Sequence, residues 1–231
     1  MKKFTLLFLI LALALSLCAC GGTEEPPKES NALVLTSPSI GVYHCEENGV
    51  TYTRRPAQYL PMRLSSEPYA THTAENGMVS SFFSFSDGTE DRYLMLADPD
   101  DLYPYYIIAA DDYQMPTLHG MDPYQIMICN AETEFFWLTP NIFDQVRDIE
   151  VVHDIVDAYV AGTAATLPIG AEPTVFVELI FVSTAYPDFA YTCTYYEYEG
   201  GASYIYERET NTCLLIQSGL FDEYRMTADE T

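Results

Sequence analysis

The stretch that decides the fold is Phe189–Gln217, FAYTCTYYEYEGGASYIYERETNTCLLIQ, in which three strand-like runs are separated by two turn sequences. In the first run, apolar or aromatic side chains alternate with small or polar ones, which is typical of a strand with one buried face. The turn sequences are Glu199–Ala202 and Thr210-Asn211, both rich in residues that favour turns. We therefore predict a three-stranded antiparallel meander.

Two-residue loops at Gly200-Gly201 and Thr210-Asn211 would place Cys193 opposite Arg208, and Arg208 opposite Cys213. The two cysteines would then lie two strands apart, at about 10 Å, whereas a disulfide needs Cα atoms within roughly 7 Å. We do not expect this pair to form a disulfide.

The same register gathers aromatic and charged side chains on the face that carries Cys193. If this face is exposed, it forms a rigid platform for a glycan or a peptide. The alternative is that these tyrosines pack beneath a helix. The candidate binding residues are Tyr191, Tyr195, Tyr204, Tyr206 and Arg208.

The clearest helical pattern follows Thr139, a favourable N-cap residue, and Pro140 at the first helical position. Apolar side chains recur at steps of three or four from Ile142 to Tyr159, and Gly162 ends the pattern. This spacing predicts one long amphipathic helix over residues 140–161 that lays its apolar face on a sheet.

The rest of the chain is rich in short apolar and aromatic runs separated by turn sequences. Asn48-Gly49 predicts a hairpin, and Pro61 confines its run to a sheet edge. We therefore expect a single α+β domain over residues 39–226, mostly antiparallel β-sheet in meanders and hairpins, with a disordered tail at 227–231. The predicted strands are Ile40–Cys45, Val50–Arg54, Tyr59–Leu64, Met78–Phe85, Arg92–Ala97, Tyr105–Ala110, Tyr124–Cys129, Phe135–Leu138 and Val175–Val182.

The N-terminus has the pattern of an export signal. Met1-Lys2-Lys3 is positively charged, and Phe4–Leu17 is an apolar run too short to span a bilayer stably. Ala19 then precedes Cys20. Residues 1–22 resemble the lipobox signal of bacterial membrane lipoproteins, although Cys18 departs from its commonest pattern.

This resemblance implies cleavage of residues 1–19 as a signal peptide and a diacylglycerol on the thiol of Cys20. The expected location is the extracytoplasmic face of the cell membrane, with the lipid bilayer as a partner through acylated Cys20. Residues 20–38 would then be the lipidated cysteine and a flexible spacer. The alternative is an ordinary secretory signal cut near Ala19.

The charge of the chain excludes some partners. Its formal net charge is -24, from 34 acidic and 10 basic residues, so it repels nucleic acid and we expect no nucleic-acid partner. Because 48% of its residues are hydrophobic, it can still bury a substantial core and is no disordered acidic tail.

Acidic turns offer a weak calcium site at Asp98, Asp100 and Asp101, although solvated turn residues explain them as well. We expect no cofactor. His119 and Asp122 could form half of an acid/base pair. No G-x-S-x-G, H-E-x-x-H or glycine-rich phosphate loop is present, so the sequence leaves open whether the chain is an enzyme and favours a role without catalysis.

Beyond the signal, the cysteines are Cys45, Cys129, Cys193 and Cys213, whose pairing the sequence leaves open. The function that we expect is non-enzymatic binding to a protein or a glycan at the cell surface. The alternatives are an extracytoplasmic hydrolase or cell-wall enzyme, and a solute-binding lipoprotein, a class that generally has two α/β lobes.

Overall fold

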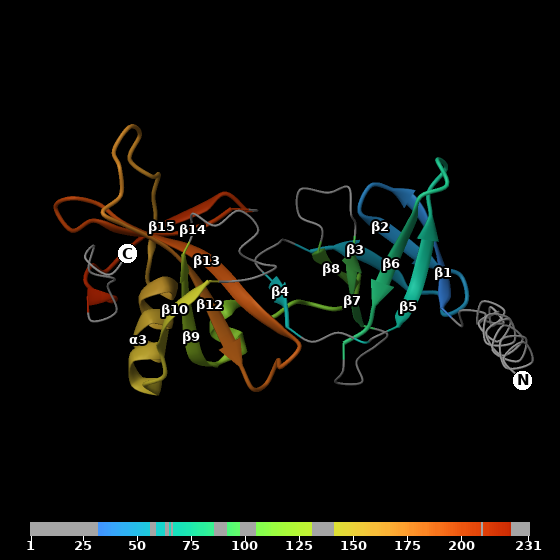
Figure 1. The fold of residues 1–231 in the computed structure, drawn as a ribbon, viewed down its shortest axis with the longest axis horizontal. Coiled ribbons are helices and arrows are strands. Elements are labelled where there is room, and N and C mark those ends of the chain that lie inside the picture. The colour runs from blue at the N-terminus through green and yellow to red at the C-terminus, as the bar shows by residue number, and fades with distance from the viewer. Residues whose placement is uncertain are drawn as a thin grey trace, which may run out of the picture. The chain divides into compact units, whose positions relative to one another are not determined.

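The computed structural model describes residues 32–55, 59–62, 65, 67–85, 92–97, 105–130, 141–208 and 210–222. Within these ranges the protein is mostly β-sheet, with a closed barrel, a second sheet and two helices of four and twelve residues (Figure 1). The predicted α+β fold with one long amphipathic helix is therefore wrong.

Seven strands form the barrel, in the order β1-β2-β3-β8-β7-β6-β5. Neighbouring strands pair antiparallel except at the closure, where β1 and β5 run parallel and Leu33 lies opposite Ala70. The interior is filled by side chains such as Tyr52, Phe82 and Leu94, all fully buried. The barrel strands are β1 (Leu33–Ser39), β2 (Val42–Cys45), β3 (Thr51–Arg54), β5 (Pro68–Thr73), β6 (Val79–Phe83), β7 (Tyr93–Ala97) and β8 (Tyr105–Ala110).

Several sequence predictions for the barrel are confirmed. β2 and β3 form the hairpin predicted around Asn48-Gly49, and Gly49 has the positive φ of 72° that favours glycine. β6, β7 and β8 form the predicted antiparallel series. The predicted spacer is wrong from residue 33 onward, because β1 occupies Leu33–Ser39 and closes the barrel.

The second sheet has the order β10-β9-β12-β13-β14-β15-β11, and β4 adds to β13. β12 lies between β9 and β13, as expected for a central strand. The strands of the second sheet are β4 (Tyr59–Pro61), β9 (Pro123–Asn130), β10 (Ile142–Val146), β11 (Thr163–Ala164), β12 (Val175–Ser183), β13 (Phe189–Glu197), β14 (Ser203–Glu207) and β15 (Thr212–Ile216).

The predicted helix over 140–161 divides into a strand and a shorter helix. Ile142–Val146 is β10, which pairs antiparallel with β9, and only Ile149–Val160 forms the helix α3. Asp148 is its N-cap, whereas Thr139 and Pro140 lie outside the described residues. Local spacing favoured a helix at 142–146, but pairing with β9 satisfies the same backbone groups and decides the conformation.

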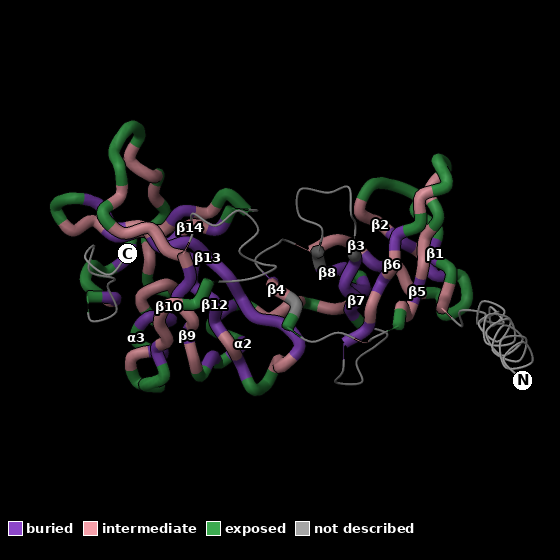
Figure 2. Tube along the Cα trace, viewed as in Figure 1, coloured by how far each residue is buried: buried purple, intermediate pink, exposed green. Residues whose placement is uncertain are grey.

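The helix α3 packs on one face of the second sheet, against β9, β10 and β15. Val152, Ile155 and Val156 are buried there in one core cluster with sheet residues such as Leu179 and Phe181 (Figure 2). The other described helix, α2, is Leu118–Met121. Neither helix of the described ranges has the length and apolar character needed to cross a membrane.

Candidate functional site

The meander β13–β14–β15 has two chemically different faces. Tyr195 pairs with Ile205, and both belong to the core cluster that α3 covers; Leu214, which pairs with Ile205, packs against that cluster. We call this the helix face. The residues that alternate with these along each strand point to the other side of the sheet, which we call the aromatic face. It carries Phe176, Tyr196, Tyr204, Tyr206 and Leu215.

The predicted tyrosine platform is wrong because the register differs by one residue. Tyr198 donates its N–H to the carbonyl of Ala202, so the loop has three residues, Glu199 to Gly201, and not two. Gly200 and Gly201 both have positive φ, at 93° and 84°. A shift of one residue moves every side chain of a strand to the opposite face relative to its partner.

The five candidate residues are thereby separated. Tyr191 and Tyr195 are buried on the helix face, where the hydroxyl of Tyr195 lies 3.0 Å from Oε2 of Glu197. Tyr204 and Tyr206 lie half-buried on the aromatic face, and Arg208 follows β14 as an exposed residue. The expectation that the tyrosines pack under a helix holds for the first two only.

The rings of the aromatic face contact one another across three strands. Tyr196 stacks on Phe176, with ring centroids 5.0 Å apart, and meets Tyr206 edge-on at 6.4 Å. Tyr198 continues the row, stacked on Tyr196 at 6.5 Å and edge-on to Tyr204 at 5.7 Å. Such mutual contacts hold the rings in fixed orientations at little cost in side-chain entropy.

A buried carboxyl group lies in the same surface. Glu178 is only 3% exposed, and its Oε1 accepts a hydrogen bond of 2.8 Å from the hydroxyl of Thr194. Burial raises the pKa of Glu178 above its ordinary value, while Thr194 and the charge of Arg208 oppose the rise. Burial also raises the pKa of Tyr196 to about 12, so this phenol is protonated at neutral pH.

On the helix face, the buried carboxyl group of Glu207 accepts several hydrogen bonds, and sequence analysis did not single it out. The phenols of Tyr159 and Tyr191 both donate to its Oε1, and the hydroxyl of Thr210 donates to Oε2 at 2.8 Å. The cluster lies where β4 and β14 follow one another along the same edge of β13. Three donors compensate the desolvation of this carboxylate.

The chemistry of this cluster is that of fixed hydrogen-bond donors. Burial raises the pKa of Tyr159 and of Tyr191, and hydrogen bonding to Glu207 adds to both rises. Burial likewise raises the pKa of the Cys193 thiol well above its ordinary value, with further contributions from Glu178 and Glu207. The phenols and the thiol therefore stay protonated, which disfavours nucleophilic attack from this cluster.

The remaining candidates are not assembled into a site. Asp122 forms its ion pair with His153, 3.4 Å away, and not with His119. Asp98, Asp100, Asp101 and Cys20 lie outside the described residues. Among the residues that the structure describes, no group of His, Cys, Asp or Glu could hold a metal ion.

The cysteines of the described body are free and buried, namely Cys45, Cys129, Cys193 and Cys213. Cys193 lies on the helix face, whereas Cys213, opposite Tyr206, lies on the aromatic face. Burial raises the pKa of the Cys129 thiol to about 11, and the nearby Glu178 adds to the rise.

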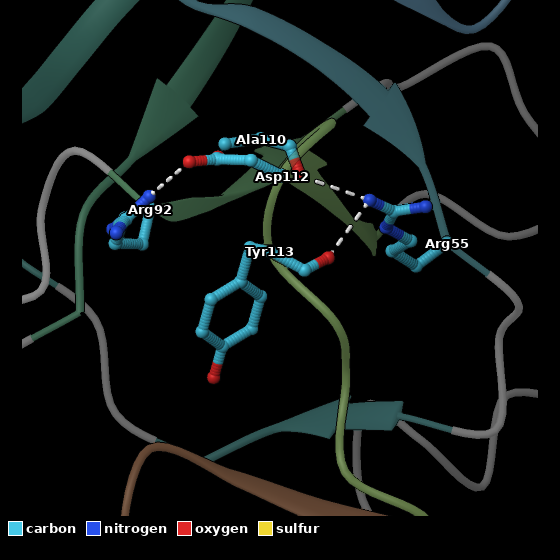
Figure 3. A network of polar contacts seen from close by, with 5 residues as sticks. All are labelled: Arg55, Arg92, Ala110, Asp112 and Tyr113. Atoms are coloured by element: carbon cyan, nitrogen blue, oxygen red, sulfur yellow. Dashed lines mark hydrogen bonds and ion pairs between the residues drawn. The ribbon is translucent and has the colours of Figure 1, made fainter.

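Arg55 and Arg92 form polar contacts with the turn that follows β8 (Figure 3). Arg55 donates through Nη2 to the carbonyls of Ala110 and Tyr113, at 3.0 and 3.2 Å, and Nη1 of Arg92 lies 2.8 Å from Asp112. Arg92 and Asp112 are both largely exposed, so this ion pair contributes little to stability. The network fixes a turn of the barrel, and we assign it a structural role.

Comparison of the chain with family models, with curated proteins and with solved structures finds no match. Its function must therefore be argued from its own residues. One signal in the sequence pointed to the aromatic face: Glu178 is the single charged residue in the otherwise apolar run Val175–Val182. Glu207 gave no such signal, because it stands at the end of the mixed strand SYIYE, next to the polar turn that follows.

Proposed function

We propose that this chain is a lipoprotein held by acylated Cys20 at the outer face of the cell membrane, where its β-rich body binds a partner without catalysis. The observation that carries the location is the sequence Leu17-Cys18-Ala19-Cys20 after a short apolar run. A lipid on Cys20 would hold the body close to other surface components, which raises their effective concentration and lowers the affinity needed for binding.

The binding role is supported by the aromatic face. Its half-buried rings Phe176, Tyr196 and Tyr206 pack against one another, and Tyr204 packs against Tyr198, which suits recognition better than acid/base chemistry. The buried carboxyl groups of Glu178, Glu197 and Glu207 in the second sheet accept hydrogen bonds from neighbouring hydroxyls. A binding surface built on strands is also more rigid than one built on loops.

The anchor is tested by replacing Cys20 with alanine in the full-length chain. We expect Cys20→Ala to lose labelling by a palmitate tracer and to accumulate as a soluble protein or an uncleaved precursor. The matched control is Cys18→Ala, which removes the neighbouring cysteine and should keep the label and the membrane fraction. Lipid label retained by Cys20→Ala, or absent from the wild type, would contradict the proposal.

The binding role is tested by crosslinking on intact cells that express the tagged lipoprotein. We expect a specific partner to be captured and to be lost when Tyr196 and Tyr206 are both replaced by alanine. The matched control is Tyr124→Ala, since Tyr124 is an exposed tyrosine at the start of β9. Capture that is equal for all variants would remove the aromatic face from the proposal.

A further inference from the structure

Resting on the proposed function, we infer that the aromatic face binds a neutral oligosaccharide. The surface concerned consists of Phe176, Tyr196, Tyr204, Tyr206 and Leu215, with Glu178 and Arg208 beside the rings. All of these residues except Arg208, which follows β14, come from four strands of one sheet, so their spacing is fixed by the backbone pairing and not by loop conformation.

The shape of the surface fits a flat, extended ligand. Tyr204 and Leu215 lie directly opposite one another on β14 and β15, and Tyr196 lies opposite Tyr204 on β13. The row thus crosses the sheet from strand to strand, at about 4.8 Å per strand. Leu215 is 40% exposed and the tyrosines are partly exposed, so apolar and phenolic atoms are presented together. Sugar rings offer apolar C–H faces and peripheral hydroxyls, which match this mixture.

Charge selects among the ligand classes that stack on aromatic rings. The chain carries a net charge of -24, which repels nucleic acids and other polyanions. The cation that belongs to this surface is Arg208, which lowers the pKa of both Tyr196 and Glu178 and therefore lies near both. It disfavours a second cation stacked on the same rings. A neutral ligand avoids both repulsions.

The polar groups of the face are suited to hydroxyl ligands. The Tyr206 phenol lies 3.1 Å from Oδ1 of Asn211, and that of Tyr196 stays protonated at neutral pH because burial raises its pKa to about 12. Phenols both donate and accept hydrogen bonds, as sugar hydroxyls do. A ligand lacking hydroxyl groups would cover the Tyr196 phenol without offering it a hydrogen-bond partner, whereas the Tyr206 phenol already donates to Asn211.

The test measures binding of the full-length chain, purified in detergent, to a glucose hexamer and an N-acetylglucosamine hexamer by calorimetry. We expect one hexamer to bind, and Tyr196→Ala and Tyr206→Ala each to weaken binding by about tenfold or more. Tyr196→Phe, which keeps the ring, should stay within about threefold of the wild type, and Tyr124→Ala should bind normally.

A second measurement uses the wild-type chain and so does not depend on the folding of any variant. Nitration of tyrosines by tetranitromethane should be reduced at Tyr204 and Tyr206 when the bound hexamer is present, and unchanged at Tyr124. Absence of binding by both hexamers, or protection confined to other tyrosines, would overturn the inference.

The same assay with a decalysine peptide distinguishes the inference from the proposed function. If decalysine binds and Tyr196→Ala abolishes its binding, the ligand is cationic and the inference is wrong, while the binding role stands. If both hexamers and decalysine fail to bind and no partner is captured on cells, the proposed function fails as well.

Discussion

The hydroxyl of Thr194 donates a hydrogen bond of 2.8 Å to Oε1 of Glu178, on the neighbouring strand of the second sheet. The two residues lie directly opposite one another, and both are 3% exposed. Glu178 is thus a buried carboxyl group whose neutral form burial favours. This relationship makes the stability of the sheet depend on pH.

Replacing Glu178 with glutamine should increase stability at neutral pH. Burial raises the folded-state pKa of Glu178 above the ordinary value of 4.5. The contribution of the Glu178 carboxyl group to the free energy of unfolding is therefore fully present below pH 4.5 and is lost as pH rises through the raised pKa. Glutamine stays neutral and can still accept from Thr194. Each unit of pKa elevation corresponds to about 1.4 kcal/mol, and each kcal/mol to roughly 2–4 °C in melting temperature.

The measurement is the melting temperature of Glu178→Gln minus that of the wild type, followed upward from about pH 4, near the ordinary carboxyl pKa. We expect this difference to grow in favour of the variant as pH rises. The exposed Glu172 supplies the control, since Glu172→Gln removes a carboxyl group from a solvated position and should change the melting temperature little. A constant or declining difference for Glu178→Gln would show that the carboxyl group is not desolvated.

Replacing Tyr191 with phenylalanine should destabilise the protein. This substitution removes one of the hydroxyl donors to Glu207 and leaves the buried carboxylate less compensated. Hydrogen bonds to charged groups contribute about 1.5–3 kcal/mol, and we expect a loss in this range from urea unfolding. The control is Tyr204→Phe, because the Tyr204 hydroxyl makes no hydrogen bond within the described residues. Equal stabilities for the two variants would contradict the role of this cluster.

Replacing Gly162 with alanine should destabilise the end of α3 by steric overlap. A Cβ at this position would lie 3.0 Å from Cβ of Leu214 and 3.0 Å from the carbonyl oxygen of Tyr159. Overpacking of this kind costs about 1–3 kcal/mol, measured by urea unfolding. Gly170 is the contrasting site, because it has open space but a φ of 75°. Asparagine tolerates such a φ, so it should be accepted at residue 170 and rejected at 162.

Replacing Asp148 with alanine tests where α3 begins. The carboxylate of Asp148 accepts the N–H of Glu150 at 3.0 Å, so its loss should cost about 1 kcal/mol of unfolding free energy. Asp154→Ala, at an exposed position inside the helix, should be neutral or slightly stabilising, because alanine is the better helix former. A loss of stability in Asp154→Ala that equals the loss in Asp148→Ala would contradict the assigned N-cap.

Much of the strand content could be predicted from the sequence. Alternation, β-branched residues and turn sequences located β2, β3, β12 and β13 within a few residues, because these signals depend on neighbours along the chain. β1 and β5 were missed. They contain prolines and polar residues, and they become strands through the parallel pairing that closes the barrel.

The candidate site was predicted only in part. Tyr204 and Tyr206 were correctly placed together on one face, but Tyr191 and Tyr195 were assigned to that face although they lie in the core. Tyr196 was missed for the same reason, and Phe176 was missed because it reaches this face through the pairing of β12 with β13. One additional residue in the loop Glu199–Gly201 accounts for the exchanged faces of Tyr191, Tyr195 and Tyr196, since the period of a strand is two.

The sequence alone determined the candidate anchor at Cys20, the acidic charge and the positions of most strands, because each depends on residues close together in the chain. Only the tertiary structure decided that Ile142–Val146 is a strand, which face of the meander each tyrosine occupies, and that Glu178 and Glu207 are buried. The physical reason is that strand register and burial depend on hydrogen bonds and packing between segments far apart in sequence. The same local pattern is compatible with more than one such arrangement.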